Sequence, residues 1–480
     1  MVKSKFYYTL HIEKTKRSDD KMKRENQWNN YDAAELEVLE KVNAAYREYL
    51  DAGKTERECV TECIRLAEEA GYQSLESAIA SGVKLQKGSK VYSQCMGKSI
   101  VLFQLGEEPL EKGMNILGAH IDSPRIDVKQ NPLCEDNEFA YLDTHYYGGI
   151  KKYQWVATPL ALHGVVVRKD GTKVEIVIGE KEDDPVLVIT DLLVHLSREQ
   201  LDKPARTVIE GEKLDLLIAN KPLEGEEKDA VKAGVLKLLK ENYNIEEEDF
   251  LSAELEIVPA GKARECGIDR SMIMAYGQDD RVCAFTSLLA MLETKDVKRT
   301  ACCILVDKEE IGSVGATGMT SKFFENAVVE LMDVVEGYSE VKFRRAMANS
   351  KMLSSDVSAA FDPLYAASFE KKNSAFFAHG LVFNKYTGSG GKGGSNDANA
   401  EYVAELRKIM DDNNVAFQTA ELGAVDVGGG GTIAYVLARH VMNVIDSGVA
   451  VLCMHAPWEI TSKVDVYEAV KGYKAFLKDA

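Results

Sequence analysis

The sequence lacks several features that would place it in other protein classes. It contains no stretch of 18 uninterrupted apolar residues, so no transmembrane helix is expected. Its first residues have no continuous apolar segment followed by a cleavage site, and they do not resemble a signal peptide. The nine cysteines are irregularly spaced and include no CxxC pair, which argues against a disulfide framework and against a thiolate metal site. We therefore expect a soluble, cytoplasmic protein.

Positive charge is also in deficit. The 480 residues include 59 lysines and arginines against 77 aspartates and glutamates, which gives a formal net charge of −18. Proteins that bind nucleic acids or anionic membranes need a basic surface. The composition therefore argues against both kinds of partner. The hydrophobic fraction of 45% is ordinary for a globular protein and sufficient for a large core.

The pattern of apolar residues changes along the chain. Short apolar runs at 99–104 and 114–119 indicate buried strands, and Asp170-Gly171 lies between two alternating segments, as in a hairpin. After residue 260, strand-like and helix-like segments alternate. This alternation predicts an α/β fold with a mixed, mostly parallel sheet covered by helices on both faces. The predicted domains are 1–130 together with 261–480, and an inserted α+β domain at 131–260.

Apolar strand-like runs end repeatedly in residue types that bind metals. The runs lead to His120 and Asp122, to Asp279, to Glu309 and Glu310, and to His455. In an open α/β sheet, ligands bind at the carboxyl ends of the strands, so side chains from separate strands can converge there. This agreement in position is stronger evidence than any single motif.

The first two motifs also have purely structural interpretations. Taken alone, His120 is more simply a strand-end histidine beside a surface acid. However, Asp122 shares its face in an extended segment and can orient the ring. The pair Asp279-Asp280 is more often a helix N-cap, and capping can coexist with metal binding at a strand-to-helix turn.

The other candidate residues also have structural alternatives to a role in the site. Glu309-Glu310 is equally well a solvated acidic turn or the ligand and base of a two-metal hydrolase. Asp356 could be only another N-cap. His455 and His195 lie on apolar segments, where a packed histidine is commoner than a ligand.

Together the motifs resemble those of the aspartyl aminopeptidase family of co-catalytic metallopeptidases, in its bacterial branch. The matching segments are GAHIDSPRIDVK, GQDDRVCAF, VDKEEIGSVGA, SSDVSAAFDP and VLCMHAPWEIT. The resemblance covers nearly the whole chain, including the insertion. It implies a two-metal exopeptidase fold with an inserted dimerisation domain, and an enzyme that removes the N-terminal residue of peptides.

The resemblance also implies a role for each candidate residue. One divalent cation would be bound by His120 and Asp356, the other by Glu310 and His455, and both by Asp279. Asp122 would orient His120, and Glu309 would be the general base. Mixed histidine and carboxylate ligands suit zinc, with cobalt or manganese as alternatives. Because only Asp279 is needed as the bridge, Asp280, where many relatives carry Asn, should have little effect.

Substrate contacts and assembly follow from the same resemblance. The family histidine that matches His195 reaches the active site of a neighbouring subunit, and family members assemble from dimers into a tetrahedral dodecamer. This chain is therefore expected to be a homo-oligomer. In eukaryotic members a lysine recognises acidic substrate side chains. Lys385 is its best match and Lys392 the rival, so a preference for acidic N-terminal residues stays open.

Two other functions fit the same residues. A two-metal site of this kind could serve a carboxypeptidase or an amide deacylase. A binding or shell protein with a vestigial site would be expected to have lost a ligand or the base, and none is missing from the sequence.

Overall fold

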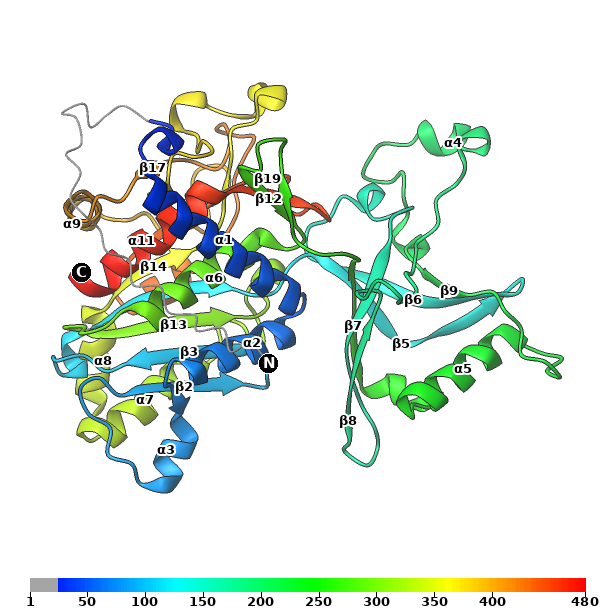
Figure 1. Cartoon of the computed structure of the whole chain (residues 1–480), viewed down its shortest axis with the longest axis horizontal. Coiled ribbons are helices and arrows are strands. Elements are labelled where there is room, and N and C mark those ends of the chain that lie inside the picture. Colours follow the sequence, from blue (N-terminus) through cyan, green and yellow to red (C-terminus); the bar gives the residue numbers. More distant parts are fainter. Residues whose placement is uncertain (1–24) are drawn as a thin grey trace.

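The computed structural model describes residues 25–480, which form two domains side by side (Figure 1). The larger domain contains sheets A and C, and the smaller one is built on sheet B. The expectation about a signal peptide concerns residues 1–24 and lies outside the described residues. Within 25–480, no helix combines the length and the apolar character needed to cross a bilayer.

Sheet A is the centre of the larger domain. Among the described residues it has nine strands, in the order β1 (Gln73–Ser74), β2 (Lys90–Cys95), β3 (Ser99–Gln104), β13 (Thr300–Val306), β4 (Met114–His120), β14 (Lys351–Ser355), β18 (Asn443–Gly448), β16 (Leu381–Asn384) and β17 (Phe417–Thr419). The central strands β13, β4, β14 and β18 are parallel, whereas β3 and β16 run antiparallel to their inner neighbours. All residues of β4 and β13 are buried, as expected for strands covered on both faces.

Helices cover both faces of sheet A and form a separate hydrophobic core on each. One face carries α1 (Ala33–Ala52), α2 (Glu56–Glu69), α6 (Gln278–Glu293), α9 (Ala400–Asp412) and α11 (Lys463–Asp479). The other carries α3 (Leu75–Ser81), α7 (Phe323–Glu336), α8 (Glu340–Asn349) and α10 (Ala434–Ala438). The predicted α/β fold class is confirmed. Short 3₁₀ helices in the connections are η1 (Gln27–Asn29), η2 (Leu110–Lys112), η3 (Lys152–Gln154), η5 (Gly211–Lys213), η6 (Glu247–Ser252), η8 (Pro363–Ser368) and η9 (Lys371–Asn373).

The first helices begin where the sequence supplies caps. Asp32 accepts backbone N–H groups at the start of α1, and Thr55 with Glu58 forms a reciprocal capping box at the start of α2. These side chains accept hydrogen bonds from backbone N–H groups that have no partner within the first turn of the helix. α1 then packs against α11 and α6. This packing fixes the helical layer from which Asp279 emerges.

The smaller domain is built on sheet B. Its strands lie in the order β8 (Lys173–Ile178), β7 (Leu160–Val167), β10 (Ala253–Pro259), β5 (Arg125–Asp136), β6 (Phe139–Tyr147) and β9 (Leu216–Ala219). The hairpin expected at Asp170-Gly171 joins β7 and β8 and is confirmed. α5 (Ala230–Tyr243) packs into this domain's own core. Sheet B begins at Arg125, before the predicted boundary at 131, and the domain boundaries stay predictions.

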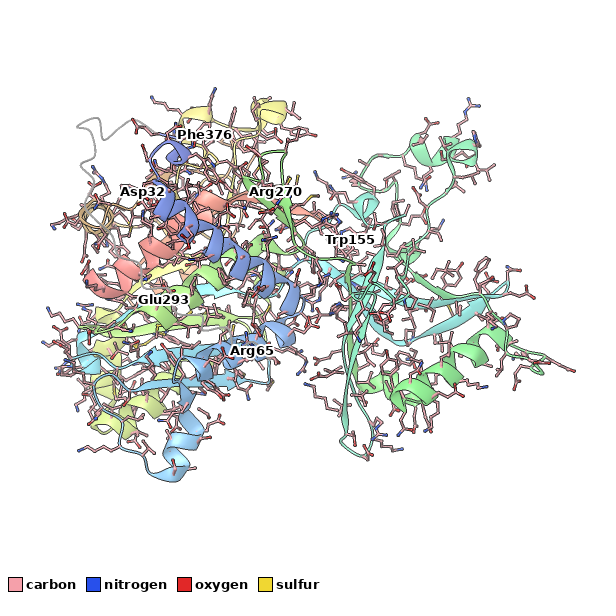
Figure 2. The ribbon with its side chains drawn as sticks, in the orientation of Figure 1. Asp32, Arg65, Trp155, Arg270, Glu293 and Phe376 are labelled. Carbon is pink, nitrogen blue, oxygen red and sulfur yellow. The ribbon has the colours of Figure 1, made fainter. Side chains whose placement is uncertain are left out.

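The two domains meet at a buried junction. Figure 2 places Trp155 between them. Its side chain is buried, and its ring lies edge-on to that of Tyr276, with 6.4 Å between the ring centroids. Ion pairs add to this contact, for example between Arg57 of α2 and Glu254 of β10. Apolar packing and charge therefore both contribute to the contact between the two domains.

Sheet C is a small sheet beside sheet A. Its strands lie in the order β11 (Arg264–Cys266), β12 (Met272–Ala275), β20 (Glu459–Ser462), β19 (Ala450–Leu452) and β15 (Ser358–Ala359). The strands leading to Asp279 and His455, β12 and β19, belong to it. The expectation that all the ligand-bearing strands share one open sheet is therefore wrong for these two. The physical reason is β20, which pairs antiparallel with both of them.

The segment around His195 needs a second correction. Its apolar character favoured a helix with a packed histidine. The structure has only the 3₁₀ turn η4 (Val194–Leu196) and the short α4 (Arg198–Leu201), and His195 is exposed. Neighbouring Leu193 and Leu196 are also exposed. Among residues 25–480, no apolar layer covers these side chains, so a longer helix gains nothing by burial.

Candidate metal centre

Neighbouring strands of sheet A bring polar side chains to one edge. His120 ends β4, Glu309 and Glu310 lie in the 3₁₀ turn η7 (Glu309–Ile311) after β13, and Asp356 follows β14. Strands β13, β4 and β14 are adjacent and parallel. Their carboxyl ends therefore meet at the same edge, where ligands of such sheets bind.

Asp279 and His455 reach the same place from sheet C. Asp279 lies in the first turn of α6, and His455 lies in the turn after β19. Glu459 of β20 accepts a backbone N–H from each of them, at 2.9 Å from Asp279 and 2.7 Å from His455. Sequence reasoning missed Glu459. Its closeness to His455 along the chain was the single available signal.

Asp279 is the centre of the cluster. Its Oδ1 lies 3.3 Å from Nε2 of His120, and its Oδ2 lies 3.2 Å from Nε2 of His455. Two groups of potential ligand atoms share it, each with its atoms within 4.8 Å of one another. These groups are His120, Asp279 and Asp356, and Asp279, Glu310 and His455. The structure thus brings together all the residues predicted as ligands.

The donor set fits divalent cations. Imidazole and carboxylate groups are common ligands of zinc. Glu310 Oε1 is buried without a hydrogen-bond partner among the described residues, and it lies 3.6 Å from Nε2 of His455. Buried carboxylates outnumber the histidines here, so negative charge is left that cations can balance.

The pKa values reflect the same crowding. Burial and the charge of Asp279 raise the pKa of Glu310 well above its usual range, and burial does the same for Asp356. Burial alone would lower the pKa of His455, but the hydrogen bond and charge of Asp279 outweigh it and raise that pKa to about 10. The pKa of His120 is raised in the same way, against burial, by Asp122 and Asp279. Protons and cations therefore compete for these groups.

Asp122 orients His120. Its Oδ1 lies 3.2 Å from Nδ1 of His120, and its carbonyl oxygen lies 2.9 Å from the same nitrogen. Both oxygens are acceptors, so Nδ1 carries a proton and Nε2 is directed to Asp279. Asp122 also accepts the backbone N–H groups of Glu309 and Glu310, at 3.1 and 3.2 Å.

Glu309 lies beside the two ligand groups and belongs to neither. Its Oε2 is 3.9 Å from Nε2 of His120. Burial raises the pKa of the Glu309 carboxyl to about 7, against the opposing effect of His120. Such a carboxyl can take up and release a proton near neutral pH, as general acid–base catalysis requires.

The structure does not bring the predicted substrate contacts into this cluster. His195 is exposed, and α4, which follows it, lies in the outer part of the smaller domain (Figure 1). Lys385 directly follows β16, and its Nζ lies 3.9 Å from Asp397. The rival Lys392 lies 2.8 Å from the same carboxylate.

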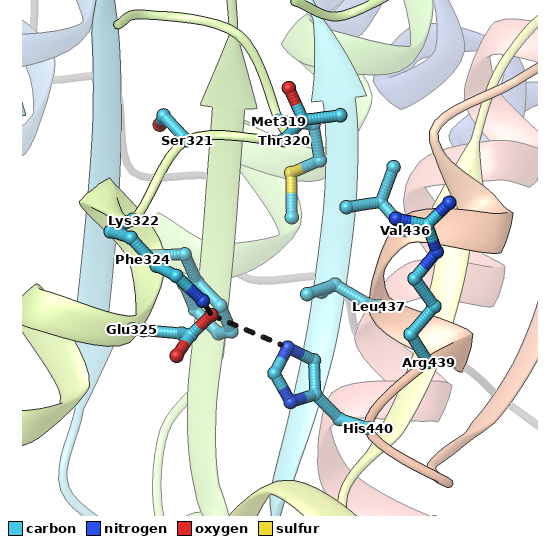
Figure 3. A pocket seen from close by; sticks show the side chains of 10 residues that line it. All are labelled: Met319, Thr320, Ser321, Lys322, Phe324, Glu325, Val436, Leu437, Arg439 and His440. Atoms are coloured by element: carbon cyan, nitrogen blue, oxygen red, sulfur yellow. Dashed lines mark hydrogen bonds and ion pairs between the residues drawn. The ribbon is translucent and has the colours of Figure 1, made fainter.

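A separate pocket of about 200 Å³ lies between the start of α7 and the end of α10 (Figure 3). There Nε2 of His440 lies 3.7 Å from Glu325. The described residues that line the pocket include no predicted site residue. The pocket is therefore distinct from the cluster around Asp279.

Comparison with known proteins identifies the family of this chain. A family model described as aminopeptidase I zinc metalloprotease (M18) matches residues 49–477. The chain belongs to the M18 family. One M18 relative, a probable M18 family aminopeptidase 1 of Clostridium acetobutylicum, is 59% identical over 455 residues, which are 95% of this chain and 98% of the relative. The prediction of a metallo-aminopeptidase is confirmed, and zinc is the metal that the family description names.

Solved structures of M18 proteins share the fold. A crystal structure of the Thermotoga maritima aminopeptidase matches with a TM-score of 0.91 and 43% identity, covering 96% of this chain and 100% of that one. The structure of aminopeptidase I from Clostridium acetobutylicum matches with a TM-score of 0.89 and 58% identity, covering 95% and 99%. A structure described as the S. cerevesiae mApe1 dodecamer has the same fold at 20% identity, with a TM-score of 0.74 and coverage of 92% and 97%.

Proposed function

We propose that this M18 aminopeptidase removes the N-terminal residue of peptides with two divalent cations, most simply zinc, held around Asp279. The observation that carries the proposal is the position of Asp279, whose two carboxylate oxygens each face the Nε2 atom of a histidine. In this arrangement Asp279 would hold both cations. His120 and Asp356 would complete one site, and Glu310 and His455 would complete the other.

The residues of the chain divide the chemistry between them. When bound, two such cations acidify a shared water and polarise the peptide carbonyl. Glu309 takes a proton from the water as the water oxygen attacks the carbonyl carbon. Glu309 then delivers that proton to the departing amine. Asp122 holds the ring of His120 fixed during both steps through its contact with Nδ1.

We further propose a homo-oligomer, a tetrahedral dodecamer built from dimers. The segment that contains His195 supports this proposal, because Val194 and Leu196 are 70% and 67% exposed in the single chain. Exposed apolar clusters commonly mark contacts between proteins. In such an assembly His195 contacts the substrate carbonyl in a neighbouring subunit and stabilises its developing negative charge. A distant relative is described as a dodecamer.

For an acidic first residue of the substrate, we propose Lys385 as the contact. Lys392 is already engaged, since its Nζ lies 2.8 Å from Asp397 and 3.7 Å from the ring centre of Tyr386. The contact of Lys385 with Asp397 is longer, at 3.9 Å, and leaves its ammonium group freer to meet a substrate carboxylate.

The cellular setting and the division of the chain are proposals too. The nine cysteines, all within 25–480, are free thiols, which supports a cytoplasmic location. We propose that 1–130 and 261–480 form the catalytic domain and that 131–260 form a dimerisation domain.

A substrate panel tests the proposed reaction. The protein is reconstituted with zinc, cobalt or manganese and assayed with chromogenic aminoacyl substrates and with peptides that have free or acetylated N-termini. We expect hydrolysis of the first residue of free peptides and none of the acetylated ones. Hydrolysis of acetylated peptides, or release of the C-terminal residue, would assign the chain to the amide deacylases or the carboxypeptidases.

A further inference from the structure

A short segment of the inserted domain touches the groups that orient both histidines of the cluster. Tyr147 ends β6, and its Oη donates a hydrogen bond to Oδ2 of Asp122 across 2.8 Å. Two residues later, the carbonyl oxygen of Gly149 accepts a hydrogen bond from Nδ1 of His455 across 2.9 Å. One segment therefore reaches His455 directly and His120 through Asp122.

These contacts decide which ring nitrogen faces the cluster. A carbonyl oxygen can only accept, so Nδ1 of His455 carries a proton and its Nε2 is directed to Asp279. Asp122, which Tyr147 holds, imposes the same arrangement on His120. Outer hydrogen bonds of this kind fix the tautomer and the orientation of metal-binding histidines.

The glycines allow the backbone to approach this closely. A Cβ atom at Gly149 would lie 3.3 Å from Nδ1 of His455, tighter than ordinary contacts. Gly148 has φ of +73°, which other residues adopt at a cost, and its Cβ would lie 3.4 Å from Glu310. The backbone of this segment thus runs directly against two of the proposed ligands.

The ring of Tyr147 is held from its other side by Arg125. The guanidinium carbon lies 3.8 Å from the ring centroid, and the two residues are directly opposed in the pairing of β5 with β6. Arg125 is itself buried and paired with Asp127 at 2.8 Å and Glu256 at 3.1 Å. Burial and the charge of Asp122 raise the pKa of the Tyr147 hydroxyl, which therefore stays a donor.

We propose that Tyr147 is a positioning residue of the metal centre, acting on His120 through Asp122, while the Gly149 carbonyl positions His455. The inserted domain then contributes to cation binding within its own chain, in addition to any role in assembly. This inference rests on the proposed two-cation function. It predicts that loss of one oxygen atom in the inserted domain weakens metal binding.

The test compares two tyrosines. Tyr147→Phe keeps the ring on Arg125 and removes only Oη. Tyr402→Phe is the matched control, because Tyr402 is also buried and its Oη donates to the carbonyl of Met352 across 3.0 Å. Zinc affinity of the metal-free proteins is measured by competition with a chromophoric chelator, and kcat and KM are measured on the zinc-loaded proteins.

Tyr147→Phe is expected to bind zinc about 10–100-fold more weakly and to lower kcat with little change in KM. Tyr402→Phe is expected to match the natural protein in both respects. Unchanged zinc affinity of Tyr147→Phe would overturn the inference, and so would an equal loss in Tyr402→Phe. If the proposed two-cation function is itself wrong, the result differs. His120→Ala would then leave the zinc binding of the natural protein unchanged.

Discussion

The backbone N–H of Glu309 donates a hydrogen bond to Oδ1 of Asp122 across 3.1 Å. The same carboxylate oxygen lies 3.2 Å from Nδ1 of His120. The proposed general base and a proposed metal ligand are therefore anchored to one buried group. Proton transfer depends on such fixed placement, because a small displacement of the base costs rate.

Glu309→Gln is expected to keep the metal centre and lose turnover. The amide cannot accept the proton of the attacking water, so kcat should fall by about 10²–10⁴-fold. Bound zinc, measured by elemental analysis, should be unchanged. Glu310→Gln is the matched variant and should lose bound zinc, since it alters a ligand. Near-normal hydrolysis by Glu309→Gln would show that the base lies elsewhere.

His195 is expected to act in a neighbouring subunit. His195→Ala should lower kcat by about 10²–10³-fold, the usual effect of removing a group that stabilises the oxyanion. Co-expressed His195→Ala and Glu309→Gln chains should recover part of the activity, because a subunit with an intact base can receive His195 from its neighbour. This role would be contradicted if light scattering showed a monomer and that monomer were fully active. Mixed particles without recovered activity would also contradict it.

Lys385 is expected to set the preference for acidic first residues. Lys385→Met should lower kcat/KM for an aspartyl substrate about tenfold relative to a leucyl substrate, because one charge-assisted hydrogen bond is lost. Lys392→Met is the control and should leave the ratio of the two substrates unchanged. If both variants keep the ratio of the natural protein, the assignment of Lys385 is wrong.

The contact of the inserted domain with α2 is expected to depend on pH. Nδ1 of His163 lies 2.8 Å from Glu58, and its Nε2 lies 3.0 Å from Glu180. Burial opposes the charge on His163, but hydrogen bonds to the two carboxylates outweigh burial and raise the pKa of His163. Burial also opposes the charges of Glu58 and Glu180, but their hydrogen bonds to His163 help to lower the pKa of both carboxyls. The contribution of His163 to stability is therefore complete below about pH 6.5 and is lost as pH rises through its raised pKa. That of the carboxylates is present above about pH 4.5 and is lost as pH falls through their lowered pKa values.

His163→Gln should accordingly lower the Tm more at about pH 5.5 than at about pH 9, by roughly 3 °C. His440→Gln is the control of opposite sign. Burial lowers the pKa of His440, so folding is penalised below about pH 6.5 and the variant should gain relative stability there. Equal shifts of the His163→Gln Tm at both pH values would show that the His163 ion pair makes no pH-dependent contribution to stability.

The parts of the fold that could be predicted have local causes. Strands β4 and β13 are buried on both faces, so each is a largely apolar run that leads directly to polar residues. That pattern located His120 and Glu309. The hairpin at Asp170-Gly171 has an equally local signal in its turn residues.

The parts that could not be predicted depend on contacts between distant segments. The membership of β12 and β19 in sheet C depends on β20, which lies far from β12 in the chain. Tyr147 approaches Asp122 because β5 and β6 pair, and no spacing rule in the sequence links the two residues. The exposure of His195 likewise depends on what the folded chain leaves uncovered.

Anomalous diffraction from crystals of the zinc-reconstituted protein tests the central claim most directly. We expect two zinc peaks about 3.5–4 Å apart. Asp279 should lie between them, with His120 beside one peak and His455 beside the other. A single peak, or peaks that Asp279 does not bridge, would contradict the two-cation mechanism.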